Sequence, residues 1–146
     1  MKSYFLKIAV LFIVPVSISL AAAPCKNATL KGRYGLLTDG TQSLGESFNA
    51  VGAIRFDGRG HFTSSGTVTR EYQSEDIYSV PPVITEYQSE GTYLVSKDCS
   101  VRIDEYSSPS FIMPNAQIGV LANGGTKIFA IPTESGKNFS LIYEKQ

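Results

Sequence analysis

The sequence predicts an all-β protein, built as an eight-stranded antiparallel meander that closes into a small barrel. Apolar and polar residues alternate through most of the chain after residue 24, and no stretch there has the apolar period of an amphipathic helix. Tyr, Phe, Val, Ile and Thr gather in runs, and most of the 13 glycines and 7 prolines separate those runs. This pattern is typical of short strands joined by turns. A two-sheet β-sandwich made from the same strands is the alternative arrangement.

Eight runs of strand-forming residues are separated by turn-forming segments. In chain order the predicted strands are Leu30–Thr38, Phe48–Phe56, His61–Gln73, Val83–Ser96, Ser100–Tyr106, Ile112–Ala122, Lys127–Thr133 and Asn138–Glu144. The segments between them read DGTQSLGE, DGRG, a loop with two prolines, KDC, SSPS, NGG and ESGK. Asp-Gly, Asn-Gly and Ser-Gly pairs suit turns because glycine adopts positive φ at little steric cost. Connections this short make consecutive strands antiparallel neighbours, and closure of the meander removes its two open edges.

Alternation also predicts which side chains face inward. In the second strand the inward set is Phe48, Ala50, Gly52, Ile54 and Phe56. In the third strand it is Phe62, Ser64, Gly66, Val68, Arg70 and Tyr72. Because these faces are the more apolar ones, we expect them to line the inside of the barrel.

The string EYQSE occurs twice, at 71–75 and at 86–90. We interpret the repeat as strand pairing in which Tyr72 lies opposite Tyr87, because an antiparallel hairpin then sets each Glu against a Gln of the other copy. The same register places Gly66 opposite Tyr93. A glycine beside an aromatic residue suits the curvature of a small barrel.

A candidate ligand site follows from extending the inward faces toward one end of the barrel. They bring the polar and aromatic side chains of Arg70, Tyr72, Tyr87 and Glu105 to the same side as apolar ones. Apolar walls with a few polar groups are typical of ligand pockets. Should Arg70 and Glu105 both be interior, they need each other or a ligand, since an unpaired buried charge is costly. The alternative is a barrel filled by its own side chains, with both charges near a rim in water.

Familiar catalytic and metal-binding patterns do not occur in this sequence. His61 is the only histidine, and its position beside the DGRG turn favours an exposed turn residue over a general base. A single histidine and two cysteines that we expect to be bridged give neither a catalytic triad nor a zinc site. The sequence therefore predicts no metal, no cofactor and no catalytic residue, and it favours a binding protein over an enzyme.

The first 21 residues read as a secretory signal peptide. Lys2 and Lys7 precede an apolar run, Ile8–Leu20, which gives way to small residues, and we expect cleavage after Ala21. A lipoprotein acylated at Cys25 is the alternative, which Pro24 disfavours. Residues 22–146 then form a single domain in a secreted or periplasmic protein, with no membrane span after cleavage.

The cysteine count and the charge limit the partners further. Cys25 and Cys99 are the two cysteines, and in an oxidising compartment we expect them to form a disulfide. The whole chain has 13 basic and 13 acidic residues, so removing Lys2 and Lys7 leaves 11 against 13 and a net charge of −2. Such a surface does not recruit nucleic acid.

Three segments resemble a group of small secreted bacterial proteins: LKGRYGLLTDG, VGAIRFDGRGHFTSSGTVT and EGTYLVSKDCSVRI. Proteins of this group are similar to barrels of the allene oxide cyclase and calycin type. The resemblance covers most of residues 25–146 and implies an eight-stranded antiparallel barrel around a central cavity. The broad class contains carriers of apolar ligands and cyclases that act by shaping a bound lipid. It implies no catalytic residue for this chain.

Taken together, these features predict a secreted or periplasmic barrel that binds a small apolar molecule in its cavity. A cavity-shaping, cyclase-like enzyme is the first alternative. An envelope or matrix protein that has a filled barrel and acts through its surface is the second.

Overall fold

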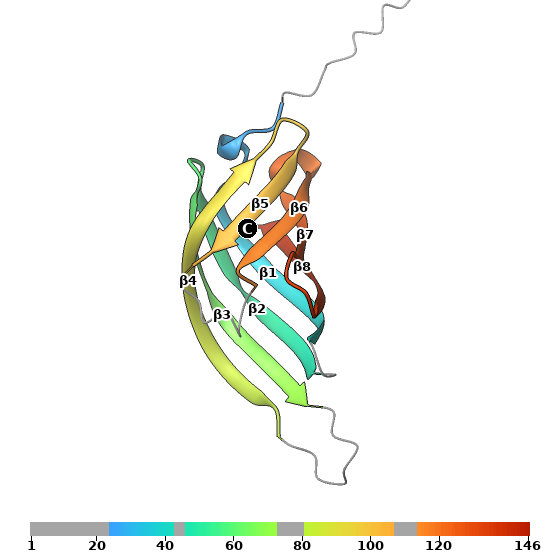
Figure 1. Cartoon of the computed structure of the whole chain (residues 1–146). Helices are drawn as coiled ribbons and strands as arrows, with labels where there is room; N and C mark the ends of the chain where they lie inside the picture. Colours follow the sequence, from blue (N-terminus) through green and yellow to red (C-terminus); the bar gives the residue numbers. More distant parts are fainter. Residues whose placement is uncertain (1–23, 43–45, 73–80, 107–113) are drawn as a thin grey trace, which may run out of the picture.

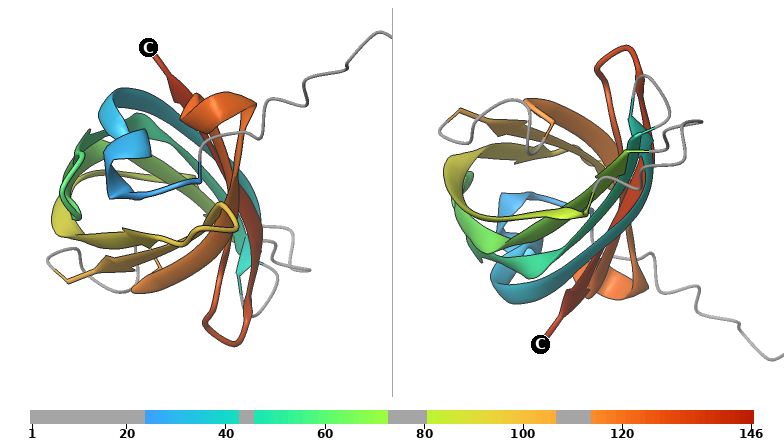
Figure 2. Two further views of the ribbon diagram at one scale, coloured as in Figure 1. Left: turned by 90° about the horizontal axis from the view of Figure 1, so that it is seen from above. Right: turned by 90° about the horizontal axis from the view of Figure 1, so that it is seen from below.

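The computed structural model describes residues 24–42, 46–72, 81–106 and 114–146, without the side chains of Asp39, Gln42 and Tyr72. Its eight strands form one closed barrel in which every strand pairs antiparallel with its neighbours in sequence, and β1 also pairs with β8 (Figures 1 and 2). The predicted meander barrel is therefore confirmed, and the β-sandwich alternative is wrong. The predicted signal peptide lies outside the described residues.

The strands keep the predicted order and most of the predicted limits. They are β1 (Lys31–Gln42), β2 (Glu46–Asp57), β3 (His61–Tyr72), β4 (Val83–Val95), β5 (Ser100–Glu105), β6 (Ala116–Ala122), β7 (Lys127–Pro132) and β8 (Lys137–Lys145). Two short 3-10 helices, η1 (Asn27–Thr29) and η3 (Asn123–Gly125), precede β1 and join β6 to β7. Residues 114 and 115, predicted to continue the sixth strand, lie outside β6.

One correction to the strand limits concerns Gly40, which was predicted to lie in a turn but belongs to β1. Gly40 pairs with Phe48 of β2 on one side and with Phe139 of β8 on the other. The two phenyl rings stack with centroids 4.7 Å apart. A Cβ atom at Gly40 would overlap Phe139. This glycine therefore serves close packing of the barrel wall, and Asp-Gly here does not end the strand.

The register of the hairpin β3–β4 also differs from the prediction. Tyr87 lies opposite Gly66, not opposite Tyr72, and Phe62 lies opposite Gly91. The two EYQSE copies consequently do not face each other, since Glu86 pairs with Thr67. Both pairings put an aromatic ring over a glycine, and added Cβ atoms at Gly66 and Gly91 would come within 2.9 and 2.7 Å of those rings. Packing of rings on glycines explains the observed register better than contact between two tyrosines does.

We expect Gly66→Ala to lower the free energy of unfolding by about 2 kcal/mol, because the new methyl group would overpack the wall. It would meet the Val51 carbonyl oxygen and the Tyr87 ring. Gly35→Ala is the matched control on β1, where the added atom would meet the Gln146 side-chain amide at 3.1 Å and the Glu144 carbonyl oxygen at 3.8 Å. Urea unfolding of both variants measures the difference. Equal losses would show that the glycine–tyrosine packing does not hold the register.

One end of the barrel is covered by the segment before β1 that carries η1, which we call the plug (Figure 2). Leu30 is fully buried there, and the Tyr93 hydroxyl donates a hydrogen bond to its carbonyl oxygen at 2.9 Å. The Val95 backbone N–H donates to Asn27 Oδ1 at 2.8 Å. Beneath the plug an aromatic cluster centred on Phe56 packs inside the barrel, formed with Tyr34, Phe62, Tyr93 and Tyr143. This end of the barrel is therefore occupied by the chain's own side chains.

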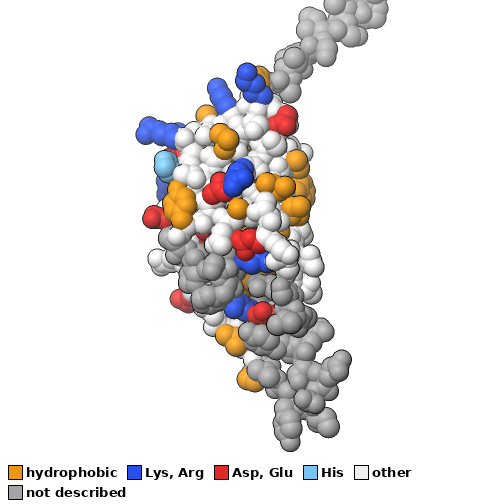
Figure 3. Space-filling view, in the orientation of Figure 1, with side chains coloured by type: hydrophobic (Ala, Val, Ile, Leu, Met, Phe, Trp, Pro, Cys, Tyr) orange, Lys and Arg blue, Asp and Glu red, His pale blue; other side chains and the backbone are white. Residues whose placement is uncertain are grey.

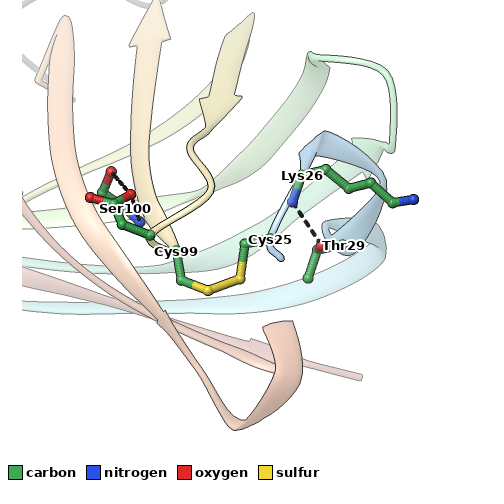
Figure 4. The surroundings of a disulfide bond; sticks show 6 residues. Cys25, Lys26, Thr29, Cys99 and Ser100 are labelled. Carbon is green, nitrogen blue, oxygen red and sulfur yellow. Dashed lines mark hydrogen bonds between the residues drawn. A yellow bond between two sulfur atoms is a disulfide. The ribbon is translucent and has the colours of Figure 1, made fainter. Parts of the chain in front are cut away.

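The predicted disulfide is present between Cys25 and Cys99 (Figure 4). It links the segment before η1 to the turn between β4 and β5, with a Cα–Cα distance of 5.1 Å. Next to it the Lys26 backbone N–H donates to Thr29 Oγ1 at 3.1 Å. The bridge and these hydrogen bonds hold the plug over its end of the barrel.

Candidate functional site

The candidate site is the part of the barrel interior away from the disulfide. Its walls come from the last residues of β1 and β3 and the first residues of β2, β4 and β8, which lie toward the opposite end of the barrel (Figure 1). Buried apolar side chains line it, namely Phe48, Ala50, Val68, Phe139 and Leu141. The predicted inward faces of β2 and β3 are thus confirmed for their apolar side chains, whereas Tyr72 lies outside the described side chains.

Tyr87 forms one side of the interior. Its side chain is 4% exposed, its ring lies against Gly66, and its hydroxyl reaches across to Gly52 of β2. Ser64 Oγ lies 3.5 Å from that hydroxyl. Burial raises the pKa of Tyr87, an effect that the Ser64 contact partly opposes. The phenol is therefore neutral and can offer a hydrogen bond to the interior.

Glu105 is the last residue of β5, where it pairs with Gly91 of β4. Its acidic side chain lies on the inner wall, and the residue is 8% exposed. Burial raises its pKa from an ordinary value of 4.5 to about 7. The Ser89 hydroxyl and the Lys137 ammonium group act in the other direction. Nevertheless, Ser89 Oγ and Glu105 Oε1 are both buried without a hydrogen-bond partner among the described residues. Each of these two oxygen atoms therefore lacks a hydrogen bond within the described part of the chain.

Tyr143 extends this polar group across the barrel. Its hydroxyl donates a hydrogen bond to Gln117 Oε1 at 2.6 Å, and both side chains are 1% exposed. Burial raises the pKa of Tyr143 well above its usual value, and the charges of Glu105 and Tyr87 raise it further. A carboxyl group and two phenols thus share one electrostatic environment. It disfavours any second negative charge.

Arg70 has a different partner from those that the sequence suggested. Its Nε lies 3.6 Å from Glu46 Oε1, and the two side chains are 12% and 13% exposed. Glu46 begins β2 and was predicted to lie in a loop. Lys137, the cation that acts on Glu105, pairs with Glu134 at 2.6 Å. Both cations near this end therefore have glutamate partners, whereas the described residues form no ion pair with Glu105.

The four predicted site residues are placed as follows. Arg70, Tyr87 and Glu105 lie on the inner wall, as alternation predicted. Tyr72 is the last residue of β3 and pairs with Glu46, but its side chain lies outside the described part. Sequence reasoning missed Tyr143 and Gln117. The alternation of Phe139, Leu141 and Tyr143 could have indicated that Tyr143 faces inward. Its contact with Gln117 depends on the three-dimensional arrangement and could not be predicted from the sequence.

The outer wall has a groove of about 490 Å³ over β2, β3 and β4, which is an alternative location for a site. Its polar lining residues are exposed, among them Arg55, His61 and Glu90. His61 lies at the DGRG turn, as predicted, and its backbone N–H donates to Asp57 Oδ1 at 3.0 Å. The unsatisfied buried groups are inside the barrel, and we therefore place the candidate site there.

Comparison of the chain with family models, curated proteins and solved structures finds no match. Among the described residues, no three His, Cys, Asp or Glu side chains are grouped so as to hold a metal ion. Within the same part of the chain, no helix has the length and apolar character needed to cross a membrane. The barrel itself is consistent with a calycin-like fold.

Proposed function

We propose that the protein binds a small, largely apolar molecule inside the barrel, with the polar end of the molecule at Glu105. The observation that carries this proposal is the buried Glu105 carboxyl, for whose Oε1 the described chain provides no hydrogen-bond donor. Leaving such a group unsatisfied is costly, and a donor on a bound molecule would remove the cost. The apolar wall around Phe48, Val68 and Phe139 would cover the rest of the molecule.

The polar end of the ligand is expected to be a hydrogen-bond donor, such as a hydroxyl or an amine. Arg70 and Lys137 already have carboxylate partners, so an anionic group would have to compete with Glu46 and Glu134. A second anion would also be repelled by ionised Glu105. A hydroxyl or an amine can instead donate to Glu105.

We also propose that this binding takes place outside the cytoplasm, in the secreted or periplasmic setting that the signal-like segment at 1–21 predicts. The Cys25–Cys99 bridge supports the proposal, because disulfides persist mainly in oxidising compartments. The resemblance to secreted bacterial proteins and to barrels of the allene oxide cyclase and calycin type supports it as well.

The probe N-phenyl-1-naphthylamine, an apolar amine with one N–H donor, should bind the folded protein saturably with a stoichiometry near one. At pH 8 we expect Glu105→Gln to weaken binding about tenfold, because a charged acceptor is lost. Arg70→Ala should also weaken it, by releasing Glu46 into the interior. His61→Ala on the outer wall is the control and should leave the affinity unchanged. Fluorescence titration that shows no saturation would replace this proposal with a filled barrel that acts through its surface.

One observation favours an enzyme as the second candidate. A carboxyl group with a pKa of about 7 beside two buried phenols is suited to general acid–base catalysis near neutral pH. An enzyme would convert a component of a lipid extract, which mass spectrometry detects. Glu105→Gln would then stop the conversion while probe binding, though weaker, persisted. A binding protein would release the lipid unchanged.

A further inference from the structure

The outer face of β6 and β7 is apolar as well as the inner one. Ile118 and Val120 of β6 and Phe129 and Ile131 of β7 point outward, with exposures of 47%, 55%, 46% and 54%. They form a block of cross-strand pairs, Ile118 with Ile131 and Val120 with Phe129. Figure 3 shows hydrophobic side chains gathered over these strands. We call these four residues the β6–β7 patch.

The β6–β7 patch continues onto β4. Arg102 of β5 lies opposite Ile118 and, on its other side, opposite Leu94, which is 60% exposed. A groove of about 410 Å³ joins these residues, and Ile131 also lines it. Exposed apolar side chains therefore lie on β4, β6 and β7, with Arg102 of β5 between Leu94 and Ile118.

The size of this surface matches one half of a protein–protein interface. Its five side chains are about half exposed, and side chains of this size each have a total surface on the order of 150–200 Å², so they present roughly 450 Å² of apolar surface. A standard interface takes about 800 Å² from each partner, of which somewhat more than half is apolar. The β6–β7 patch with Leu94 can supply that apolar share.

Charges at the edges of the patch suggest what covers it. On the β5 side Arg102 and Asp104 form an ion pair at 2.8 Å, and at the β7–β8 edge Lys127 and Glu144 pair at 3.3 Å. Each of these two edges of the β6–β7 patch thus has one cation and one anion, and the two ion pairs add no net charge. Such a rim does not select a strongly charged partner, but it can face a copy of itself without an excess of like charge.

We propose that the β6–β7 patch pairs with the same patch of a second copy, in a two-fold symmetric dimer. The contact would bury Phe129 and Val120 near its centre and leave the charged pairs at its rim. It goes beyond the proposed function, because the patch is on the outer wall and the interior site takes no part in it.

Sedimentation equilibrium over a protein concentration range of about 1 to 100 μM tests the dimer. The parent protein should show a monomer–dimer equilibrium, and Phe129→Lys should raise the dissociation constant at least tenfold. Val51→Lys is the matched control, because Val51 is 62% exposed but lies on β2, on the opposite side of the barrel. It should dimerise like the parent. Circular dichroism checks that each variant is folded, and Val120→Lys replaces Phe129→Lys if the latter is not.

Three outcomes would overturn the proposal. The parent could stay monomeric over the whole range, or Val51→Lys could weaken association as much as Phe129→Lys does. A trimer or larger ring would also contradict a two-fold contact, because it requires two different surfaces on each copy.

Discussion

Glu105→Gln should make the protein more stable than the parent at pH 8 by roughly 3 kcal/mol, whereas the two should be nearly equal at pH 4. The expectation rests on burial, which raises the pKa of Glu105 from 4.5 in an exposed chain to about 7 in the folded protein. Glutamine has the shape of the protonated side chain and does not ionise. It therefore removes the cost of a buried charge without opening a cavity.

The sign of the effect follows from proton binding. Between pH 4.5 and about 7 the unfolded chain has released the Glu105 proton, while the folded protein still holds it. Raising the pH across this interval favours the unfolded chain, so the contribution of Glu105 to stability is greatest below pH 4.5 and falls by up to about 1.4 kcal/mol per pH unit. Above pH 7 the Glu105 carboxyl is ionised in both the folded and the unfolded protein, so its contribution to stability no longer changes with pH.

Urea unfolding at several pH values measures this dependence in the parent and in the variant. Glu86→Gln is the control, since Glu86 is exposed on the outer face of β4 and should leave the pH profile of the parent unchanged. Parallel profiles for the parent and Glu105→Gln would show that the carboxyl is not buried in the folded protein. The acceptor role proposed for Glu105 would then lose its basis.

The fold could be predicted from the sequence because alternation has a fixed period of two residues. Once the strands were located, that period decided the direction of every side chain in them. The expected inward residues Phe48, Ile54, Phe56, Phe62 and Val68 are all buried. Short turns then left antiparallel neighbours as the simplest connection, and the closed meander followed.

The register of β3 and β4 could not be predicted in the same way. Pairing Tyr72 with Tyr87 satisfied every cross-strand preference that a single hairpin offers. The observed register instead depends on Gly52 of β2, which leaves room for the Tyr87 hydroxyl two strands away. Comparing the sequences of β3 and β4 alone cannot reveal a contact that β4 makes with β2.

The candidate site was predictable in part for a related reason. Alternation placed Arg70, Tyr87 and Glu105 on the inner wall, because direction is a local property. Their partners are not local. Glu46 reaches Arg70 because β2 begins earlier than its composition suggested, and the environment of Glu105 includes Tyr143 from the other end of the sequence.

Replacing both Cys25 and Cys99 by alanine should lower the free energy of unfolding by about 4 kcal/mol. The bridge spans a sequence separation of 74 residues, and this loop contains β1 to β4, half of the barrel. Without it, the unfolded chain gains the conformational freedom of a long open loop. The folded barrel still closes through the pairing of β1 with β8, so we expect a weaker barrel and not an unfolded chain.

The loss of stability should appear first at the plug, because the disulfide links the segment before η1 to the barrel. The Val95 amide, which donates to Asn27 Oδ1, should lose protection from hydrogen exchange before amides in the middle of β2 do. Asn27→Ala is the control that breaks this hydrogen bond but keeps the disulfide, and it should cost only about 1 kcal/mol. Two free thiols in the denatured, unreduced parent would contradict the bridge itself. A double alanine variant as stable as the parent would show that the bridge does not contribute to stability and that hydrogen bonds and packing hold the plug in place.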